Sequence, residues 1–153
     1  MKTSKTMKIL IIALLLVTVI AAGAYLALRA QIPEDAIALE YGSTTYIVDL
    51  QGIKMTEIHG ERVNGKGEIK PVDGMGFHLQ DLVAWTLGKD FTCDTVTITA
   101  SDGVSATVTA DELNEEGKVV LLWNEEDGRL QLIVFGDSDS KRSVKQVERI
   151  EVK

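Results

Sequence analysis

The chain has 153 residues, which is enough for one domain with a terminal segment. All 23 acidic residues fall within residues 31–153, against 12 of the 16 basic ones, so this region carries a formal charge of −11. Such a charge repels phosphate backbones and anionic headgroups, which argues against nucleic-acid binding and against direct lipid contact by the domain. The single cysteine, Cys93, excludes an internal disulfide.

An apolar run of 20 residues, residues 9–28, contains no charged residue. As a helix with a rise of about 1.5 Å per residue, it is about 30 Å long and crosses a bilayer core. Lys2, Lys5 and Lys8 precede the run, so residues 1–8 are predicted to be a basic cytoplasmic segment. The chain is therefore predicted to cross the cell membrane once, with its C-terminal domain outside.

Two interpretations of the apolar run stay open. An uncleaved signal-anchor is favoured because the run continues past Ala24 to Leu28, which completes a full span. A cleaved signal peptide is the alternative, since Ala22-Gly23-Ala24 supplies small residues before a cut, and the domain is then secreted. Residues 29–35 are predicted to be a linker, because Pro33 blocks continuation of the helix.

The first part of the domain is predicted to be extended. Residues 36–50 read as strands on either side of a turn at Gly42-Ser43, and residues 52–59 read as another strand. Residues 60–76 contain five glycines and Pro71. They are therefore predicted to be the longest loop of the domain.

A short helix and a hairpin are predicted next. Residues 77–87 place Leu79, Leu82 and Val83 on one face of a helix. Residues 95–109 form the clearest hairpin, since apolar residues alternate on both sides of Asp102-Gly103. This dipeptide predicts a type I′ turn.

The last third of the chain is predicted to contain one more helix and three strands. Thr109-Ala110-Asp111-Glu112 matches a capping box and predicts a helix over 110–115. Residues 118–123 and 129–135 form a second hairpin, and residues 143–152 form a closing strand whose irregular pattern indicates a bulge. Residues 36–153 are therefore predicted to be one α+β, strand-rich domain.

The order of these elements carries a family resemblance. The segments FHLQDLVAWTLG, DTVTITASDGVSATVTADEL, VVLLWNEEDGRLQLIVFG and SVKQVERIEV follow one another between Phe77 and Val152. This order resembles the C-terminal part of the molybdopterin-binding domain of sulfite-oxidase-type oxidoreductases. The resemblance implies that residues 36–153 have the mixed α+β fold of that domain, outside the membrane.

The resemblance also implies which chemistry to expect. Enzymes of the family hold molybdenum through a cysteine upstream of the L-x-x-L helix, whereas no cysteine precedes Phe77 and Cys93 lies after the helix. We therefore expect a fold that has lost its metal chemistry, with no metal site and no catalytic residue. Molybdopterin is a cofactor only in the alternative interpretation. Cys93 is predicted to be buried and inert.

Three basic residues are the candidate contacts to an anion or a pterin. Lys145 matches the lysine of the family's closing V-K motif, which in the enzymes lies close to the pterin, and Arg142 belongs to the same basic cluster. Arg62 lies with His59 in the glycine-rich region, where the family carries its metal and substrate loop. The alternative roles are structural: Lys145 protects an edge strand, and Arg62 and His59 are exposed loop residues.

Two further motif matches are rejected. Residues 60–66 spell G-x-x-x-x-G-K, but Gly67 replaces the required hydroxyl residue and Pro71 prevents a helix from following. Residues 137–148 resemble a calcium loop, but Lys141 and Arg142 occupy positions where a ligand and a glycine are required.

The function predicted from these residues is a membrane-anchored, extracytoplasmic binding or accessory module that is not a molybdenum enzyme. One alternative is a redox enzyme or subunit that binds molybdopterin without a cysteine ligand. Another is an envelope adhesion or assembly domain on an unrelated β-rich fold. Besides the membrane, contacted through residues 9–28, we expect a protein or small-molecule partner.

Overall fold

A computed structural model describes residues 5–29 and 35–153, and the chain divides into two compact units. The first contains helix α1 (Lys5–Arg29), in which Met7–Ala24 has a mean hydropathy of 2.5. Helix α1 is therefore long and apolar enough to span a membrane, which confirms the predicted N-terminal apolar helix. Lys2 and the predicted linker, apart from Arg29 and Asp35, lie outside the described residues.

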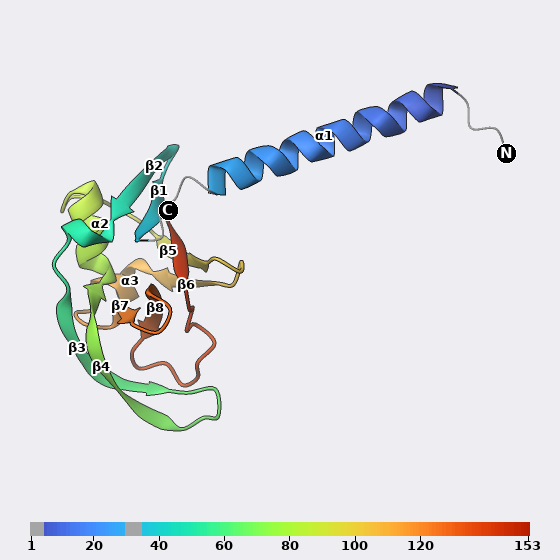
Figure 1. Cartoon of the computed structure of the whole chain (residues 1–153). Coiled ribbons are helices and arrows are strands. Elements are labelled where there is room, and N and C mark those ends of the chain that lie inside the picture. The colour runs from blue at the N-terminus through green and yellow to red at the C-terminus, as the bar shows by residue number, and fades with distance from the viewer. Residues whose placement is uncertain (1–4, 30–34) are drawn as a thin grey trace. The chain divides into compact units, whose positions relative to one another are not determined.

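The second unit, residues 34–153, is an α+β domain dominated by strands, as predicted (Figure 1). Its strands are β1 (Ala36–Tyr41), β2 (Thr44–Asp49), β3 (Thr56–Val63), β4 (Ile69–His78), β5 (Thr95–Ala100), β6 (Ser105–Thr109), β7 (Val119–Asn124), β8 (Arg129–Val134) and β9 (Val147–Val152). Helices α2 (Leu79–Leu87) and α3 (Ala110–Asn114) and a 3₁₀ turn at Leu50–Gly52 connect them.

The strands form two sheets around one core. The five-stranded sheet has the order β2-β1-β9-β5-β6, and the four-stranded sheet has the order β3-β4-β7-β8. Strand β1 runs parallel to β9, so the first and last strands of the domain are neighbours. Both sheets and the helices contribute to the main apolar cluster, which includes Leu39, Phe77, Leu82, Ile98, Leu113, Leu121, Leu132 and Ile150.

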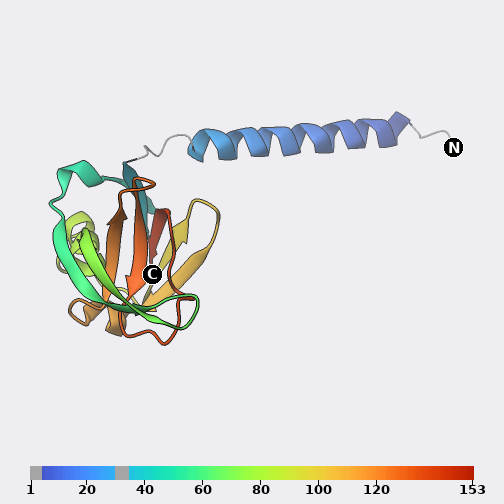
Figure 2. The ribbon, with the colours of Figure 1, turned by 60° about the horizontal axis from the view of Figure 1, so that its bottom comes forward.

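The domain contains a complete core without α1. Among the described residues, every buried hydrophobic side chain lies between Ala36 and Val152. Figure 2 shows the sheets of the domain closing around this interior. A compact unit with its own core can fold alone, so we expect residues 34–153 to be a folding unit.

The glycine-rich region is a hairpin and not the predicted long loop. Strands β3 and β4 pair from Thr56 opposite Gly76 to Val63 opposite Ile69, and they appear as a long curved hairpin in Figure 1. Its glycines mark close approach: a Cβ on Gly60 would lie 2.5 Å from the Phe135 ring, and one on Gly76 would lie 2.1 Å from the Leu121 carbonyl oxygen. The prediction was wrong because glycine inside a strand also makes room for a neighbour.

The predicted helices are confirmed with small shifts of their ends. Helix α2 begins at Leu79, because residues 77–78 belong to β4, and it buries Leu79, Leu82 and Val83. At α3 the Thr109 hydroxyl accepts a hydrogen bond from the Glu112 N–H, and the Glu112 side chain accepts one from the Thr109 N–H. This is the predicted capping box.

The hairpins are also confirmed, but the turn type predicted at Asp102-Gly103 was wrong. A type I′ turn requires a positive φ at both central residues. Only Gly103 has one, at 90°, and the Asp102 side chain accepts a hydrogen bond from the Val104 N–H. The connection between Ala100 and Ser105 is four residues long, so the tighter two-residue geometry is not needed.

The closing strand is shorter than predicted. Strand β9 begins at Val147, because Gln146 adopts a φ of 55° and the β5–β9 register shifts between Thr99 and Ala100. The predicted irregularity is therefore present. It lets both Val144 and Val147 enter the core.

Candidate functional site

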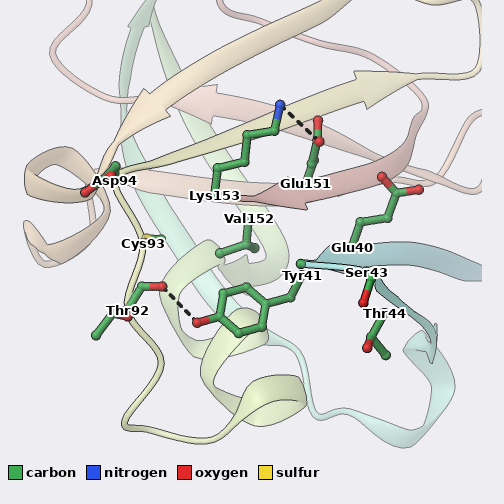
Figure 3. Close-up of a pocket in the computed structure, with 11 residues that line it drawn as sticks. Glu40, Tyr41, Ser43, Thr44, Thr92, Cys93, Asp94, Glu151, Val152 and Lys153 are labelled. Atoms are coloured by element: carbon green, nitrogen blue, oxygen red, sulfur yellow. Dashed lines mark hydrogen bonds and ion pairs between the residues drawn. The ribbon is translucent and has the colours of Figure 1, made fainter.

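A pocket of about 680 Å³ lies at the carboxyl ends of the parallel strands β1 and β9 (Figure 3). We call it the β1–β9 pocket. Its lining residues come from three separate segments: Glu40, Tyr41, Gly42, Ser43, Thr44, Thr92, Cys93, Asp94, Glu151, Val152 and Lys153. Crevices form at such strand ends because the connections leave in different directions.

The topology explains the pocket. After Tyr41 the chain turns back into β2 at Gly42, whose φ of 61° favours glycine. On the other side, the N–H groups of Asp94 and Thr95 donate to the Lys153 carbonyl oxygen and so fix the segment that leads into β5. The crevice lies between the turn and this segment.

One wall and the floor of the pocket are fixed by packing. The Tyr41 hydroxyl donates a 3.2 Å hydrogen bond to the Thr92 carbonyl oxygen, and Figure 3 shows the Tyr41 ring pointing toward that residue. Val152 is buried, and Cys93 is half-buried and packs against the core. The pocket therefore combines an apolar floor with a polar rim.

The rim carries charges of both signs. Glu40 pairs with Arg149, and the Lys153 ammonium lies 3.1 Å from a Glu151 carboxylate oxygen. Within residues 5–29 and 35–153, no ion pair is formed by the Asp94 carboxylate. The unpaired charge of the rim is thus negative, which favours an ammonium or guanidinium group over a phosphate.

Cys93 lies in this pocket but is not an activated nucleophile. Burial, and secondarily the nearby Asp94 carboxylate, raises the pKa of the Cys93 thiol. A thiol with a raised pKa is protonated at neutral pH and reacts slowly. Cys93 was predicted to be buried, but it is only half-buried. The raised pKa of its thiol favours the predicted inert character.

Arg62 and Arg142 meet elsewhere, in a crevice that we call the Arg142 crevice. It is also lined by Asp137, Asp139 and Ser143, and its volume is about 10 Å³. Lys145 does not line it and is exposed on the neighbouring segment. Of the three candidate anion contacts, the structure thus brings two together.

The guanidinium of Arg142 is held by two carboxylates. It donates to both oxygens of Glu112 at 2.8 and 2.9 Å, and to both oxygens of Asp137 at 2.8 and 2.5 Å. The hydrogen bonds from Arg142, more than the backbone N–H of Thr109, lower the pKa of Glu112 to about 2. Arg142 therefore ties α3 to the β8–β9 connection.

Arg62 links β3 to the same β8–β9 connection. Its Nη1 donates a 3.4 Å hydrogen bond to the Ser143 hydroxyl, which also accepts one of 2.9 Å from the buried Gln131 side chain. In Figure 1 and Figure 2 the tip of the β3–β4 hairpin lies beside the β8–β9 connection. Arg62 lies in β3 and not in the loop predicted for it.

These residues do not fit a pterin. A cavity of about 10 Å³ has room for about one water molecule, and Arg142 already has two anionic partners. Within the described part of the chain, no group of three His, Cys, Asp or Glu side chains could hold a metal ion. The anion contact of Arg62, Arg142 and Lys145 stays a prediction that this geometry does not support.

His59 lies on the exposed face of β3 with two carboxylates. Its Nδ1 lies 2.6 Å from an Asp73 oxygen, and its Nε2 lies 3.5 Å from a Glu57 oxygen. The hydrogen bond with Asp73, followed by that with Glu57, raises the pKa of His59. Like Arg62, His59 is in β3, which agrees with the strand predicted over residues 52–59 and not with the alternative role of an exposed loop residue.

Comparison with known proteins does not assign a ligand to either site. No family model and no curated protein matches the sequence. The resemblance to the molybdopterin-binding domain therefore stays a prediction.

Sequence reasoning missed the β1–β9 pocket. Tyr41, Asp94 and Lys153 belong to segments that only the parallel pairing of β1 with β9 brings together. No local motif marks them. Only the pairing of β1 with β9 would have placed Tyr41, Asp94 and Lys153 at the same end of the sheet.

Proposed function

We propose that the chain is a membrane-anchored, extracytoplasmic binding module whose ligand occupies the β1–β9 pocket. The observation that carries the proposal is the pocket itself. Its volume, about 680 Å³, lies within the range of roughly 300–1,000 Å³ that is usual for small-molecule sites. Its lining combines the apolar Val152 with the polar side chains of Glu40, Thr92 and Asp94.

The charges favour a ligand with a cationic group. Asp94 supplies the unpaired carboxylate of the rim, and the domain around it carries a formal charge of −11. The field of such a domain concentrates cations and repels anions. We therefore propose a small molecule, or the end of a peptide, that bears an amine or guanidinium beside an apolar part.

Binding is a better account of the pocket than catalysis. Its thiol is protonated, and no histidine lies among the residues that line it. A nucleophilic thiol requires an activating base or cation beside it. The pocket thus offers recognition groups without an activated one.

Two features support the predicted location and fold. Helix α1 and the lysines before it favour an anchor with the domain outside the membrane, a signal peptide being the alternative. The observed order of α2, the β5–β6 hairpin, α3, the β7–β8 hairpin and β9 is the order that the sulfite-oxidase-type resemblance implies. We retain that fold family as part of the proposal.

The test uses ¹⁵N-labelled residues 34–153, the unit with its own core. Cadaverine and arginine methyl ester are titrated as cationic probes, and inorganic phosphate as the anionic one. We expect the cations to shift the amide signals of residues 41–44, 92–94 and 151–153. Shifts confined to other regions, or tighter binding of phosphate, would contradict the proposal.

A matched pair of variants assigns the charge. Asp94→Asn keeps the side-chain shape and should weaken cation binding about threefold to fivefold, as an exposed ion pair allows. Asp90→Asn removes an exposed charge that does not line the pocket and should leave binding unchanged. Equal effects of both variants would show a nonspecific field and no site.

A separate measurement decides between this proposal and the cofactor alternative. The full chain is purified from a host that makes molybdenum cofactor and is analysed for molybdenum and pterin. Near-stoichiometric pterin would overturn the proposal and would direct mutagenesis to Arg62 and Lys145.

A further inference from the structure

The two sheets have four edge strands, and three of them are blocked. An edge strand presents unpaired N–H and C=O groups to which another strand can add. Charged side chains, including Glu57 and Glu61, line β3. On β6 the Thr107 carbonyl oxygen accepts a hydrogen bond from Arg142, and on β8 the Leu132 N–H donates to the Val144 carbonyl oxygen.

The fourth edge, β2, is open. It pairs with β1 through a two-residue turn, with Tyr41 opposite Thr44. The closing pair of such a hairpin exchanges both hydrogen bonds, so the backbone groups of Thr45 and Ile47 point away from β1. Within residues 5–29 and 35–153, no hydrogen bond reaches these outward groups.

The open edge has no charge before Asp49 and exposes two large hydrophobic side chains. No charged residue occurs from Tyr41 to Val48, although the domain carries a charge of −11. Tyr46 and Ile47 expose 37% and 52% of their surface. The usual protections of an edge, which are lysine, proline or a bulge, are absent from the described strand β2.

We propose that two copies of this chain pair through β2, antiparallel and about a two-fold axis at Ile47. The two five-stranded sheets then become one sheet of ten strands. In this register Ile47 lies opposite the partner's Ile47, Thr45 opposite the partner's Asp49, and Tyr46 opposite the partner's Val48. An aromatic–β-branched pair such as Tyr46 with Val48 is favourable across strands.

Charge restricts where two copies can meet and which register they adopt. Strand β2 carries one charge, that of Asp49 at its end, so two strongly acidic domains approach along its other residues with little local repulsion. A two-fold axis at Asp49 would instead place two carboxylates opposite each other, which is unfavourable. The axis at Ile47 avoids this repulsion and pairs like surfaces of the two copies, as a symmetric dimer contact requires.

The contact is weak unless the membrane assists it. A six-residue strand pair buries less than the roughly 1,200 Å² of a stable interface. Copies held in one bilayer have a much higher effective concentration. The strength of the dimer thus rests on the proposed anchoring by α1, whereas the choice of β2 as the pairing strand does not.

Cysteine cross-linking tests the register. In a Cys93→Ser background, full-length Ile47→Cys is reconstituted in phosphatidylcholine vesicles and oxidised with copper phenanthroline. Paired residues of this kind lie about 5.5 Å apart at Cα, which a disulfide spans. We expect dimers well above the level of Val104→Cys, a control whose site is 53% exposed on another turn. Equal cross-linking of both variants would overturn the proposal.

A charge variant separates β2 from other contacts. Ile47→Lys places two ammonium groups opposite each other and should lower energy transfer between labelled copies in vesicles at least about tenfold. Val104→Lys should not lower it. Energy transfer that survives Ile47→Lys would assign the contact to α1 and overturn the proposal.

If the chain does not remain with the vesicles, the anchor proposal fails, and the edge is tested on residues 34–153 alone. Sedimentation equilibrium at millimolar concentration should then show a weak dimer that Ile47→Lys removes and Val104→Lys retains. A strict monomer at that concentration would overturn the pairing.

Discussion

Replacement of Arg142 by glutamine should destabilise the domain, because it leaves two carboxylates without their shared cation. Arg142 donates hydrogen bonds to both oxygens of Glu112 and both oxygens of Asp137, and a further one to the Thr107 carbonyl oxygen. These contacts join α3, β6 and the β8–β9 connection. Glutamine keeps a polar side chain but supplies neither the charge nor the forked geometry.

The magnitude follows from the state of Glu112. Its pKa falls from 4.5 to about 2. At 1.36 kcal/mol per unit, the shift sets an upper limit of about 3 kcal/mol on the interaction. The side chains of Arg142 and Glu112 are 28% and 22% exposed, so solvent screening reduces the expected loss to about 2 kcal/mol.

The loss should depend on pH with a definite sign. The folded-state pKa of Glu112 is lower than the unfolded-state value, so the stabilisation is fully present above pH 4.5. It disappears as the pH falls toward about 2, where the carboxylate is protonated in the folded state too. The difference between wild type and Arg142→Gln should therefore narrow across this window.

Urea denaturation of residues 34–153 measures both effects, followed by far-ultraviolet circular dichroism and by the fluorescence of Trp123, which packs against the core. Lys141→Gln is the control, because the Lys141 side chain is 86% exposed in its pair with Asp139 and should contribute little. The reasoning fails if Arg142→Gln costs no more than this control, or if its cost is the same at pH 7 and pH 3.

Two other perturbations have defined outcomes. Gly76→Ala places a Cβ 2.1 Å from the backbone oxygen of Leu121, so it should lower the free energy of unfolding by about 1–3 kcal/mol or more. Gly52→Ala is the control, because a Cβ at Gly52 has nothing within 4 Å and should change the free energy of unfolding little. Equal urea midpoints for the two variants would refute this prediction. His59 should titrate above its ordinary pKa of 6.5, so its contribution to stability is complete below that pH and is lost as the pH rises through the folded-state pKa. Asp73→Asn should lower the pKa of His59 in an NMR titration. An unchanged pKa would exclude the hydrogen bond with Asp73 as the cause of the shift.

Local signals in the sequence predicted the elements that depend on local physics. The capping box at Thr109 and Glu112 satisfies donors within one helical turn, so four residues suffice to identify it. The apolar face of α2 and the alternation in β5 and β6 were likewise sufficient to find those elements. Each feature depends on neighbours within a few positions in the chain.

Features that depend on distant residues were not predictable in this way. Gly60 and Gly76 are glycines because of Phe135 and Leu121, which lie far along the chain, and in isolation they indicate a loop. The bulge at Gln146 was anticipated from an irregular pattern, but its location required the pairing with β5. The β1–β9 pocket was missed for the same reason.

The two proposals meet in the β1–β2 turn. Thr44 lines the β1–β9 pocket and is also the first residue of β2, the proposed pairing strand. A ligand that orders this turn lowers the entropy that pairing must overcome, so it should strengthen the dimer. Such coupling is reciprocal for binding equilibria. If cadaverine strengthens pairing by a given factor, Ile47→Lys must weaken cadaverine binding by up to that factor in vesicles, and must leave it unchanged in a dilute solution of residues 34–153, where no dimer exists to be lost.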